Sequence, residues 1–394
     1  MSKMLMFIFG MMIILNCNST SEKPMDFQKA DLQHIQTQLE KFAPVTIAYD
    51  KSFLSEQDQQ VVLKLVEASR LIDQIFLQQV YSQNESLKKA LLKSKDPDIK
   101  PYLDYFDIMY GSFDRLDENK PFLGTNSKPA GANFYPEDLT KTEFVQWIEN
   151  HPKIKNDFES NFTVIARKDS ELVAIPYSKA YEDQLKSAAK HLKEAAALAE
   201  NSSLKKFLAS RADAFLSNDY FQSDMDWMDL DSPIEVVIGP YEVYEDALMG
   251  YKAAFEAFIT VVDPIESDKL AIVASYLDKM EQNLPYKDEY KNFERGSSSP
   301  IKVVQEIYTA GDTQAGVQTL AFNLPNDERV QEAKGSKKVL LKNVQEAKFN
   351  KILTPIAEKV IHPDQVSNVT FDAYFNHILL HEVSHGLGPG TLVL

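Results

Sequence analysis

The sequence predicts an α+β fold in which helices predominate, and three observations support this prediction. Residues 53–81 and 180–217 repeat apolar side chains with a helical period and are rich in good helix formers. Residues 162–177 instead contain two β-rich runs around a polar turn, which is typical of a hairpin. With 394 residues and 44% apolar side chains, the chain can bury a large core and is expected to form two lobes.

The N-terminus resembles an export signal. After Lys3, the apolar run from Met4 to Leu15 is too short to span a bilayer and matches the apolar core of a signal peptide, predicted here over residues 1–16. The only cysteine, Cys17, follows this run as in a bacterial lipoprotein, which predicts lipidation of Cys17, a tether over residues 17–25 and anchoring to a membrane of the cell envelope, on its periplasmic side or at the cell surface. A plain secretory signal with an incidental cysteine is the alternative.

The next part of the chain is expected to form a mixed α+β lobe, residues 26–250. Its first long helix, within residues 53–81, carries acidic residues in its first turns, as the helix dipole favours. The segment 120–138 is rich in Pro, Gly and Asn, so we expect an ordered loop there, lined by Phe134 and Tyr135.

A β-rich run, IEVVIG, ends at Gly239-Pro240, and the sequence after it predicts a helix over residues 242–262. The end of a strand is a frequent place for reactive side chains. Here Tyr241 and Tyr244 are candidates to aim a phenol donor at an oxyanion. The neighbouring acids Glu242, Glu245 and Asp246 have a simpler explanation, because the start of a helix favours negative charge.

The most specific motif is His381-Glu382-Val383-Ser384-His385, or HExxH. On a helix, positions i and i+4 share one face about 5–6 Å apart, so His381 and His385 can bind one zinc ion. Glu382 then serves as the general base toward the water that the metal activates. Apolar residues at helical spacing precede the motif, and Gly386 is expected to end the helix. The other histidines, which we interpret as ordinary surface or core residues, are His34, His151, His191, His362 and His377.

A catalytic zinc site normally has a third protein ligand, and the position of that ligand separates the metallopeptidase classes. The metzincin pattern requires a histidine where this chain has Thr391, so a metzincin is disfavoured. In the other large class the third ligand is a glutamate tens of residues after the motif. We therefore expect residues 251–394 to form a helical zinc-motif lobe that is incomplete at its C-terminus.

The charge of the chain excludes one class of partner. The formal net charge is −16, and no cluster of Lys and Arg with interleaved aromatic residues offsets it. A polyanionic surface repels phosphates, so a nucleic-acid partner is not expected.

Three blocks in the same order, IEVVIGPYEVYED with FEAFI, then residues 310–344, then HEVSHG, resemble the dipeptidyl-peptidase III family of zinc exopeptidases. The resemblance implies that a cleft lies between a lobe with a small β-sheet or barrel, to which residues 305–328 contribute, and a helical lobe that carries the motif. It implies a Zn²⁺ cofactor and short peptides as substrates, from whose N-terminus dipeptides are removed.

The resemblance also implies roles for individual residues. His381 and His385 would be zinc ligands, Glu382 the base, and Tyr244 the donor to the scissile carbonyl. Glu242, Asn323 and Asn326 would hold the peptide ammonium, which needs polar partners when it is buried. The strand 234–238 would pair with the peptide backbone.

Two features of this sequence depart from the family pattern. The family motif has one more residue between its histidines, and the family's third ligand belongs to a glutamate-rich helix after the motif. A non-catalytic, lipid-anchored peptide-binding protein, or an inactive fragment of a longer reading frame, is therefore the alternative.

Overall fold

The computed structural model describes residues 27–291, 293, 301–384 and 387–388. The predicted signal peptide, Cys17 and the tether lie outside these residues, as do His385 and Gly386. The described helices are α1 (Leu32–Leu39), α2 (Glu56–Val80), α3 (Asn84–Lys93), α4 (Ile99–Met109), α5 (Lys141–Asn150), α6 (Lys155–Glu159), α7 (Tyr177–Ala180), α8 (Glu182–Leu198), α9 (Ser202–Ser217), α10 (Phe221–Met228), α11 (Pro264–Ala274), α12 (Leu277–Gln282), α13 (Glu328–Lys334), α14 (Lys342–Lys348), α15 (Thr354–Val360), α16 (Pro363–Val366) and α17 (Phe371–Ser384).

The strands form two small hairpins and one larger sheet. The hairpins pair β1 (Phe113–Asp114) with β2 (Lys120–Pro121), and β3 (Thr163–Lys168) with β4 (Glu171–Pro176). The larger sheet has the order β5-β6-β7-β9-β8. Its strands are β5 (Ile234–Glu242), β6 (Ala254–Val262), β7 (Ile301–Gly311), β8 (Ala321–Leu324) and β9 (Lys337–Leu341), and only the β7–β9 pair is parallel. The predicted α+β fold with predominant helices is therefore confirmed.

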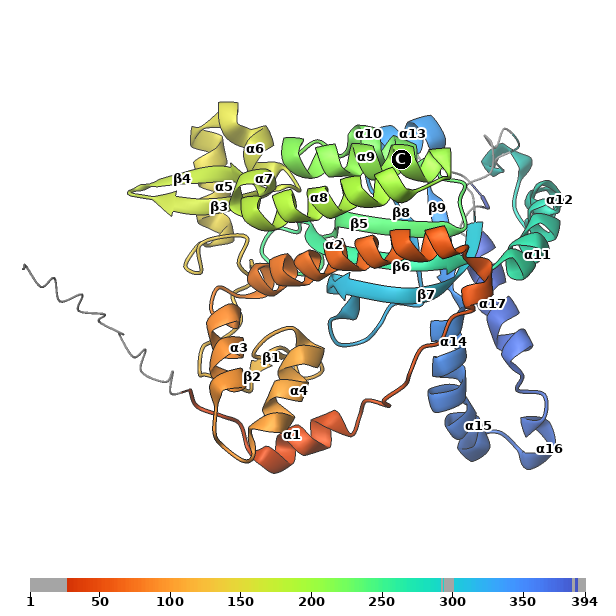
Figure 1. The fold of residues 1–394 in the computed structure, drawn as a ribbon, viewed down its shortest axis with the longest axis horizontal. Coiled ribbons are helices and arrows are strands. Elements are labelled where there is room, and N and C mark those ends of the chain that lie inside the picture. Colours follow the sequence, from red (N-terminus) through yellow and green to blue (C-terminus); the bar gives the residue numbers. More distant parts are fainter. Residues whose placement is uncertain (1–26, 292, 294–300, 385–386, 389–394) are drawn as a thin grey trace, which may run out of the picture.

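Helix α2 connects the layers of the molecule (Figure 1). It packs against the central strands on one side and against α8 on the other, and α9 packs beside α8. The helix begins with a capping box between Ser55 and Asp58, which satisfies two backbone donors that the first turn leaves unpaired. Its buried face, including Leu65 and Ile72, belongs to the main hydrophobic core. The long helices predicted within residues 53–81 and 180–217 are α2, α8 and α9.

The predicted hairpin and the predicted loop are also present. Strands β3 and β4 pair over their whole length, and Asp169 in the turn between them has the positive φ of 55° that a tight turn requires. In the loop after β2, Phe134 and Tyr135 are buried, and the Tyr135 hydroxyl donates to Asp246 at 2.7 Å. This loop is therefore an ordered part of the core.

The helix predicted over residues 242–262 is wrong, because this segment is the turn and second strand of a hairpin. The Asp246 carboxylate accepts the backbone N–H groups of Leu248, Met249, Tyr251 and Lys252, which holds the segment in a turn. The run FEAFITVV then forms β6, between β5 and β7. The β5–β6 hairpin runs across residue 250, so the predicted domain boundary falls within one sheet.

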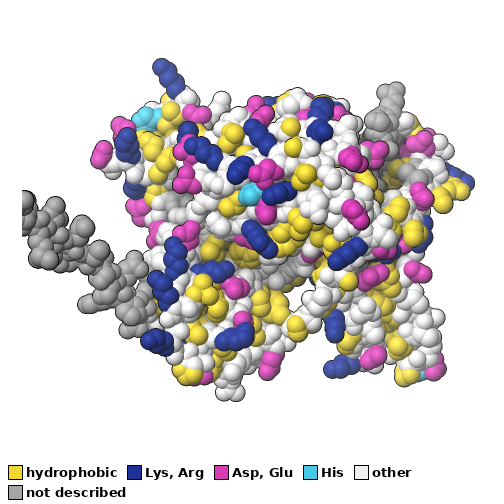
Figure 2. Space-filling view, in the orientation of Figure 1, with side chains coloured by type: hydrophobic (Ala, Val, Ile, Leu, Met, Phe, Trp, Pro, Cys, Tyr) yellow, Lys and Arg dark blue, Asp and Glu magenta, His cyan; other side chains and the backbone are white. Residues whose placement is uncertain are grey.

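Two groups of helices lie below the sheet in Figure 1, and α11 and α12 lie at its right. Helices α1, α3 and α4 form one group, and α14 to α17 form another, joined to the sheet through β9. Figure 2 shows a hollow between these two groups and side chains of both charge signs interspersed over the visible face. Among the described residues, no helix is long and apolar enough to cross a membrane.

Candidate functional site

Helix α17 carries the HExxH motif and is held against the sheet by one apolar face. Phe375, Leu379 and Val383 recur every four residues and are buried, and the first two pack with Val303 and Leu340 of the sheet. His381 lies outside this buried face and is exposed, whereas Glu382 is half-buried. The helix predicted for the motif is present through Ser384, and the second predicted ligand, His385, lies outside the described residues.

A lysine ties the end of this helix to the sheet. The Lys338 ammonium on β9 donates to the Glu382 carbonyl at 2.7 Å, a favourable place for a positive charge because it faces the negative end of the helix dipole. Lys338 lies directly opposite Asn323 of β8. Residues opposite each other in an antiparallel pair project to the same face, so Asn323 lies on the face of the sheet that meets Glu382.

Glu242 and Asn326 come together at the end of β5. The Asn326 amide donates to the Tyr241 carbonyl at 3.0 Å. Burial raises the pKa of Glu242, and a hydrogen bond from Asn326 opposes this rise. Two of the three residues predicted to hold an ammonium are therefore neighbours, and the third, Asn323, is three positions before Asn326.

The two candidate tyrosines have opposite environments. Tyr244 is 84% exposed, so its phenol is accessible to a ligand. Tyr241 is buried, and its ring lies 5.6 Å from the guanidinium of the fully buried Arg211. The prediction that Tyr241 could aim a donor at a substrate is therefore wrong, and Tyr241 is part of the core.

The strand expected to pair with a peptide is also corrected. Strand β5 is an edge strand, but its residues Ile234 to Ile238 are each 1% exposed or less, so a peptide cannot reach them. The other edge strand, β8, is more open: Ala321 and Phe322 are half-buried and Asn323 is exposed. An open edge strand offers backbone groups to a ligand.

Sequence reasoning explained Glu245 by the start of a helix, and it missed the two basic partners of this carboxylate. Glu245 accepts Arg115 Nη1 at 2.9 Å and also pairs with Lys128, although its side chain is only 2% exposed. Burial alone would raise the pKa of Glu245, but the two cations hold it below its ordinary value. A buried carboxylate with two basic partners stabilises the fold only while all three charges are present, because removing one leaves the others uncompensated. These partners come from two loops, one before and one after β2, more than a hundred residues earlier, so no local pattern pointed to them.

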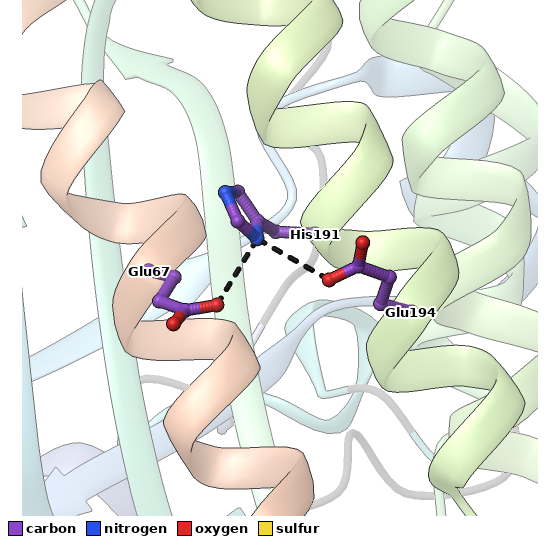
Figure 3. A group of neighbouring side chains, drawn as sticks. All are labelled: Glu67, His191 and Glu194. Carbon is purple, nitrogen blue, oxygen red and sulfur yellow. Dashed lines mark ion pairs between the residues drawn. The ribbon is translucent and has the colours of Figure 1, made fainter.

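One group of side chains has the composition of a metal site, and it is not the motif (Figure 3). Glu67 of α2 and His191 and Glu194 of α8 offer ligand atoms within 4.8 Å of one another. His191 Nδ1 lies 3.1 Å from the Glu67 carboxylate and 3.6 Å from that of Glu194. The Lys64 ammonium lies 2.8 Å and 3.1 Å from the same two carboxylates. A lysine thus supplies the positive charge between them, and the group joins α2 to α8 as an ion-pair network.

Among the described residues, this is the only group of three or more potential metal ligands, and it does not include His381. The zinc prediction therefore rests on the motif. The described part of the motif suits a metal chemically, because an exposed imidazole on a packed helix, beside a half-buried carboxylate, can present its nitrogen to zinc.

Comparisons with known proteins give consistent results. The model of peptidase family M49 matches residues 156–393. The solved structure of dipeptidyl-peptidase III from Caldithrix abyssi is 60% identical, with a TM-score of 0.88 over 91% of this chain and 68% of that one. The enzyme of the same name from Corallococcus sp. strain EGB is 44% identical, with a TM-score of 0.84 over 92% of this chain and 68% of that one.

A curated protein of Arabidopsis thaliana named Nudix hydrolase 3 is 39% identical over 412 residues, which are 91% of this chain. The chain spans about half of that relative's length, 53%.

Proposed function

Because the chain belongs to peptidase family M49, as the sequence resemblance predicted, we propose that it is a zinc-dependent exopeptidase that removes dipeptides from the N-terminus of short peptides. The observation that carries the proposal is the contact between the two parts of the site. Lys338 joins Glu382 of the motif helix to the sheet at the position opposite Asn323.

The substrate would lie along β8 with its free ammonium at Glu242 and Asn326. Burial of the ammonium is favourable there because a carboxylate and an amide oxygen can accept its protons. The peptide backbone would pair with the open edge of β8, which gives affinity with little dependence on side chains. Asn323 lies in β8, on the face of the sheet that meets Glu382, and Asn326 follows the end of this strand at Leu324. A peptide whose ammonium lies at Asn326 would therefore run along β8 toward the end of α17.

The chemistry would take place beside His381 and Glu382. When bound, zinc supplies a Lewis acid that activates water and polarises the scissile carbonyl. His381 and His385 would hold the metal. Glu382 would take a proton from the attacking water and return it to the leaving amine. The exposed phenol of Tyr244 would donate a hydrogen bond to the carbonyl oxygen as its negative charge develops.

The test combines metal analysis with a dipeptidyl-naphthylamide assay. We expect bound zinc and release of naphthylamine, with turnover lost in Glu382→Gln while the zinc content is kept. Glu358→Gln is the matched control, because Glu358 is an exposed glutamate of helix α15, outside the proposed site. Peptide binding without zinc or turnover would instead support a non-catalytic peptide-binding protein.

We also infer that the chain is exported and anchored through a lipid on Cys17. The apolar run before this cysteine supports the inference. Expression of the full chain with a radiolabelled fatty acid tests it. Label should enter the parent chain and not Cys17→Ser, and export of an unlabelled parent chain would contradict lipidation.

A further inference from the structure

The turn that carries Tyr244 is fixed by the two residues that follow it. Tyr244 is 84% exposed, whereas Glu245 and Asp246 are only 4% and 3% exposed. Both carboxyl groups stay buried only while the turn between β5 and β6 keeps one orientation, and in that orientation the phenol is exposed. The partners of these two acids therefore decide where the phenol of Tyr244 lies.

The loop after β2 supplies a partner for each acid. The Lys128 ammonium forms an ion pair with the Glu245 carboxylate, and the Tyr135 hydroxyl donates to the Asp246 carboxylate at 2.7 Å. Both partners are largely buried, so salt screens these contacts much less than it screens contacts at the surface. One loop thus holds both acids.

The loop itself is closely packed, so it is a firm support. Phe134 and Tyr135 are buried, and the Tyr135 ring contacts the Phe144 ring edge-on, with 5.7 Å between the ring centroids. A Cβ added to Gly131 would lie 2.4 Å from the Tyr135 ring, so only glycine lets the chain approach this ring. Residues packed in this way cannot follow a shift of the turn without losing contacts.

Arg115 gives Glu245 a second cation from another part of the chain. Its Nη1 lies 2.9 Å from the Glu245 carboxylate, and its Nε donates to the Met109 carbonyl at 2.8 Å. The guanidinium also lies 5.8 Å from the centre of the Phe76 ring. Its stem packs against Gly316, where an added Cβ would lie 3.4 Å from Arg115 Cδ. Arg115 therefore connects the turn between β5 and β6 with α2, with the end of α4 and with the segment before β8.

A second buried glutamate has the same kind of partners and lies away from the candidate site. Glu235 of β5 pairs with Lys302 at 3.0 Å and with Lys337 at 3.2 Å. Lys337 precedes Lys338 on β9, and adjacent residues of a strand point to opposite faces. The Glu235 ion pairs therefore lie on the face of the sheet away from Glu382. They offer a comparison in which stability changes and the candidate site does not.

We propose that three residues position the phenol of Tyr244 toward the scissile carbonyl, namely Lys128, Arg115 and Tyr135. The proposal rests on the proposed function, in which Tyr244 donates a hydrogen bond to that carbonyl. Such a donor stabilises the transition state only when it is held in place, and a misplacement of about 1 Å can lower the rate about 10²-fold. The three residues are positioning residues, because they act through Glu245 and Asp246 and have no proposed contact with the peptide or the metal.

The test compares Lys128→Met with Lys302→Met in the dipeptidyl-naphthylamide assay. Both changes remove one of two cations from a buried glutamate, and the two lysine side chains are similarly exposed, at 13% and 15%. Lys128→Met should lower kcat about 10-fold and leave KM within about two-fold, because Glu242 stays paired with Ala254 in the sheet. Lys302→Met should leave both constants unchanged, although both variants lose unfolding stability.

Tyr135→Phe is a milder second variant. It keeps the packed ring and removes only the hydroxyl that donates to Asp246, so it should also lower kcat at an unchanged KM. Tyr102→Phe is its matched control, because the buried Tyr102 donates to the Ala30 carbonyl at 2.5 Å, away from the turn.

A double variant separates positioning from a general loss of stability. In a chain that already carries Tyr244→Phe, Lys128→Met should lower kcat by less than about two-fold, because the phenol that it would displace is already absent. Two independent losses would instead multiply.

The outcomes separate this role from the proposed activity. If Lys128→Met and Tyr135→Phe lower kcat no more than their controls, or if the losses multiply in the double variant, the three residues do not position Tyr244 and the proposed function stands. A Tyr244→Phe chain with the kcat of the parent would remove Tyr244 from the mechanism and the positioning role with it. No turnover by the zinc-loaded parent chain would overturn the proposed function as well.

Discussion

Replacement of Gly311 by alanine should destabilise the sheet at the point where β7 ends. Gly311 has a φ of 73°, and an added Cβ would lie 2.2 Å from the Phe255 carbonyl oxygen and 3.1 Å from the Glu256 Cα. Both contacts are backbone atoms of the paired strand β6, so no side-chain rotation can relieve them. Gly250 provides the matched control, because its φ is 71° and nothing lies within 4 Å of an added Cβ.

The two substitutions share one cost and differ in the other. An alanine with left-handed backbone costs about 1 kcal/mol at either position. The clash at Gly311 adds about 2 kcal/mol, the usual size for forced overpacking with a backbone shift. We therefore expect Gly250→Ala to lower the unfolding free energy by about 1 kcal/mol and Gly311→Ala to lower it by about 3 kcal/mol.

Urea unfolding followed by circular dichroism measures both values, provided that the dependence on urea stays the same as in the parent chain. Equal losses of stability in the two variants would refute the reasoning, because the contact with Phe255 would then add nothing to the loss of unfolding free energy.

Three further predictions concern buried charges and the exposed phenol. Glu245→Gln should lower the unfolding free energy in urea by about 3 kcal/mol, because it leaves Arg115 and Lys128 without their shared carboxylate; a loss below about 1 kcal/mol would contradict this. Burial lowers the pKa of Lys252 to about 7, so the folded chain binds fewer protons than the unfolded chain above pH 7. This difference makes stability rise from pH 7 toward 10, and Lys252→Met should flatten the rise in thermal melts at several pH values. Tyr244→Phe should reduce kcat for a dipeptidyl-naphthylamide by about 10²-fold or more, with an unchanged melting temperature, because the phenol is exposed.

The long helices and the β3–β4 hairpin could be predicted because their signals are local. Helix α2 has a capping box and a regular apolar face, and the hairpin has a polar turn between two β-rich runs. Helix α17 was likewise predicted from apolar residues at helical spacing before the motif. In each case the residues that decide the structure lie within one turn or one strand pair of each other.

The segment after β5 was assigned incorrectly because strand pairing, with the preceding β5 and the more distant β7, overrides its helix-like composition. Residues 242–250 have a helix-like composition. In the structure, however, the Asp246 carboxylate accepts hydrogen bonds from the backbone of the turn, and β6 pairs with β7, about fifty residues later. Tertiary pairing overrides local propensity in such cases.

The accessibility of the two edge strands could not be predicted either. Strand β5 has the stronger β-sequence, yet it is buried, and the short strand β8 is the open edge. Only the order β5-β6-β7-β9-β8 shows that both are edges. The sequence resemblance supplied Glu242, Asn323 and Asn326, and the fold shows that Glu242 and Asn326 are neighbours.

Product analysis of a single peptide tests the proposed activity most directly. A hexapeptide with a free N-terminus is incubated with the full chain and zinc, and the products are followed by mass spectrometry over time. We predict that the N-terminal dipeptide and the remaining tetrapeptide appear together, followed by the second dipeptide, and that the N-acetylated hexapeptide stays intact. Release of single residues, cleavage inside the acetylated peptide, or no cleavage by a zinc-loaded chain would contradict the assignment.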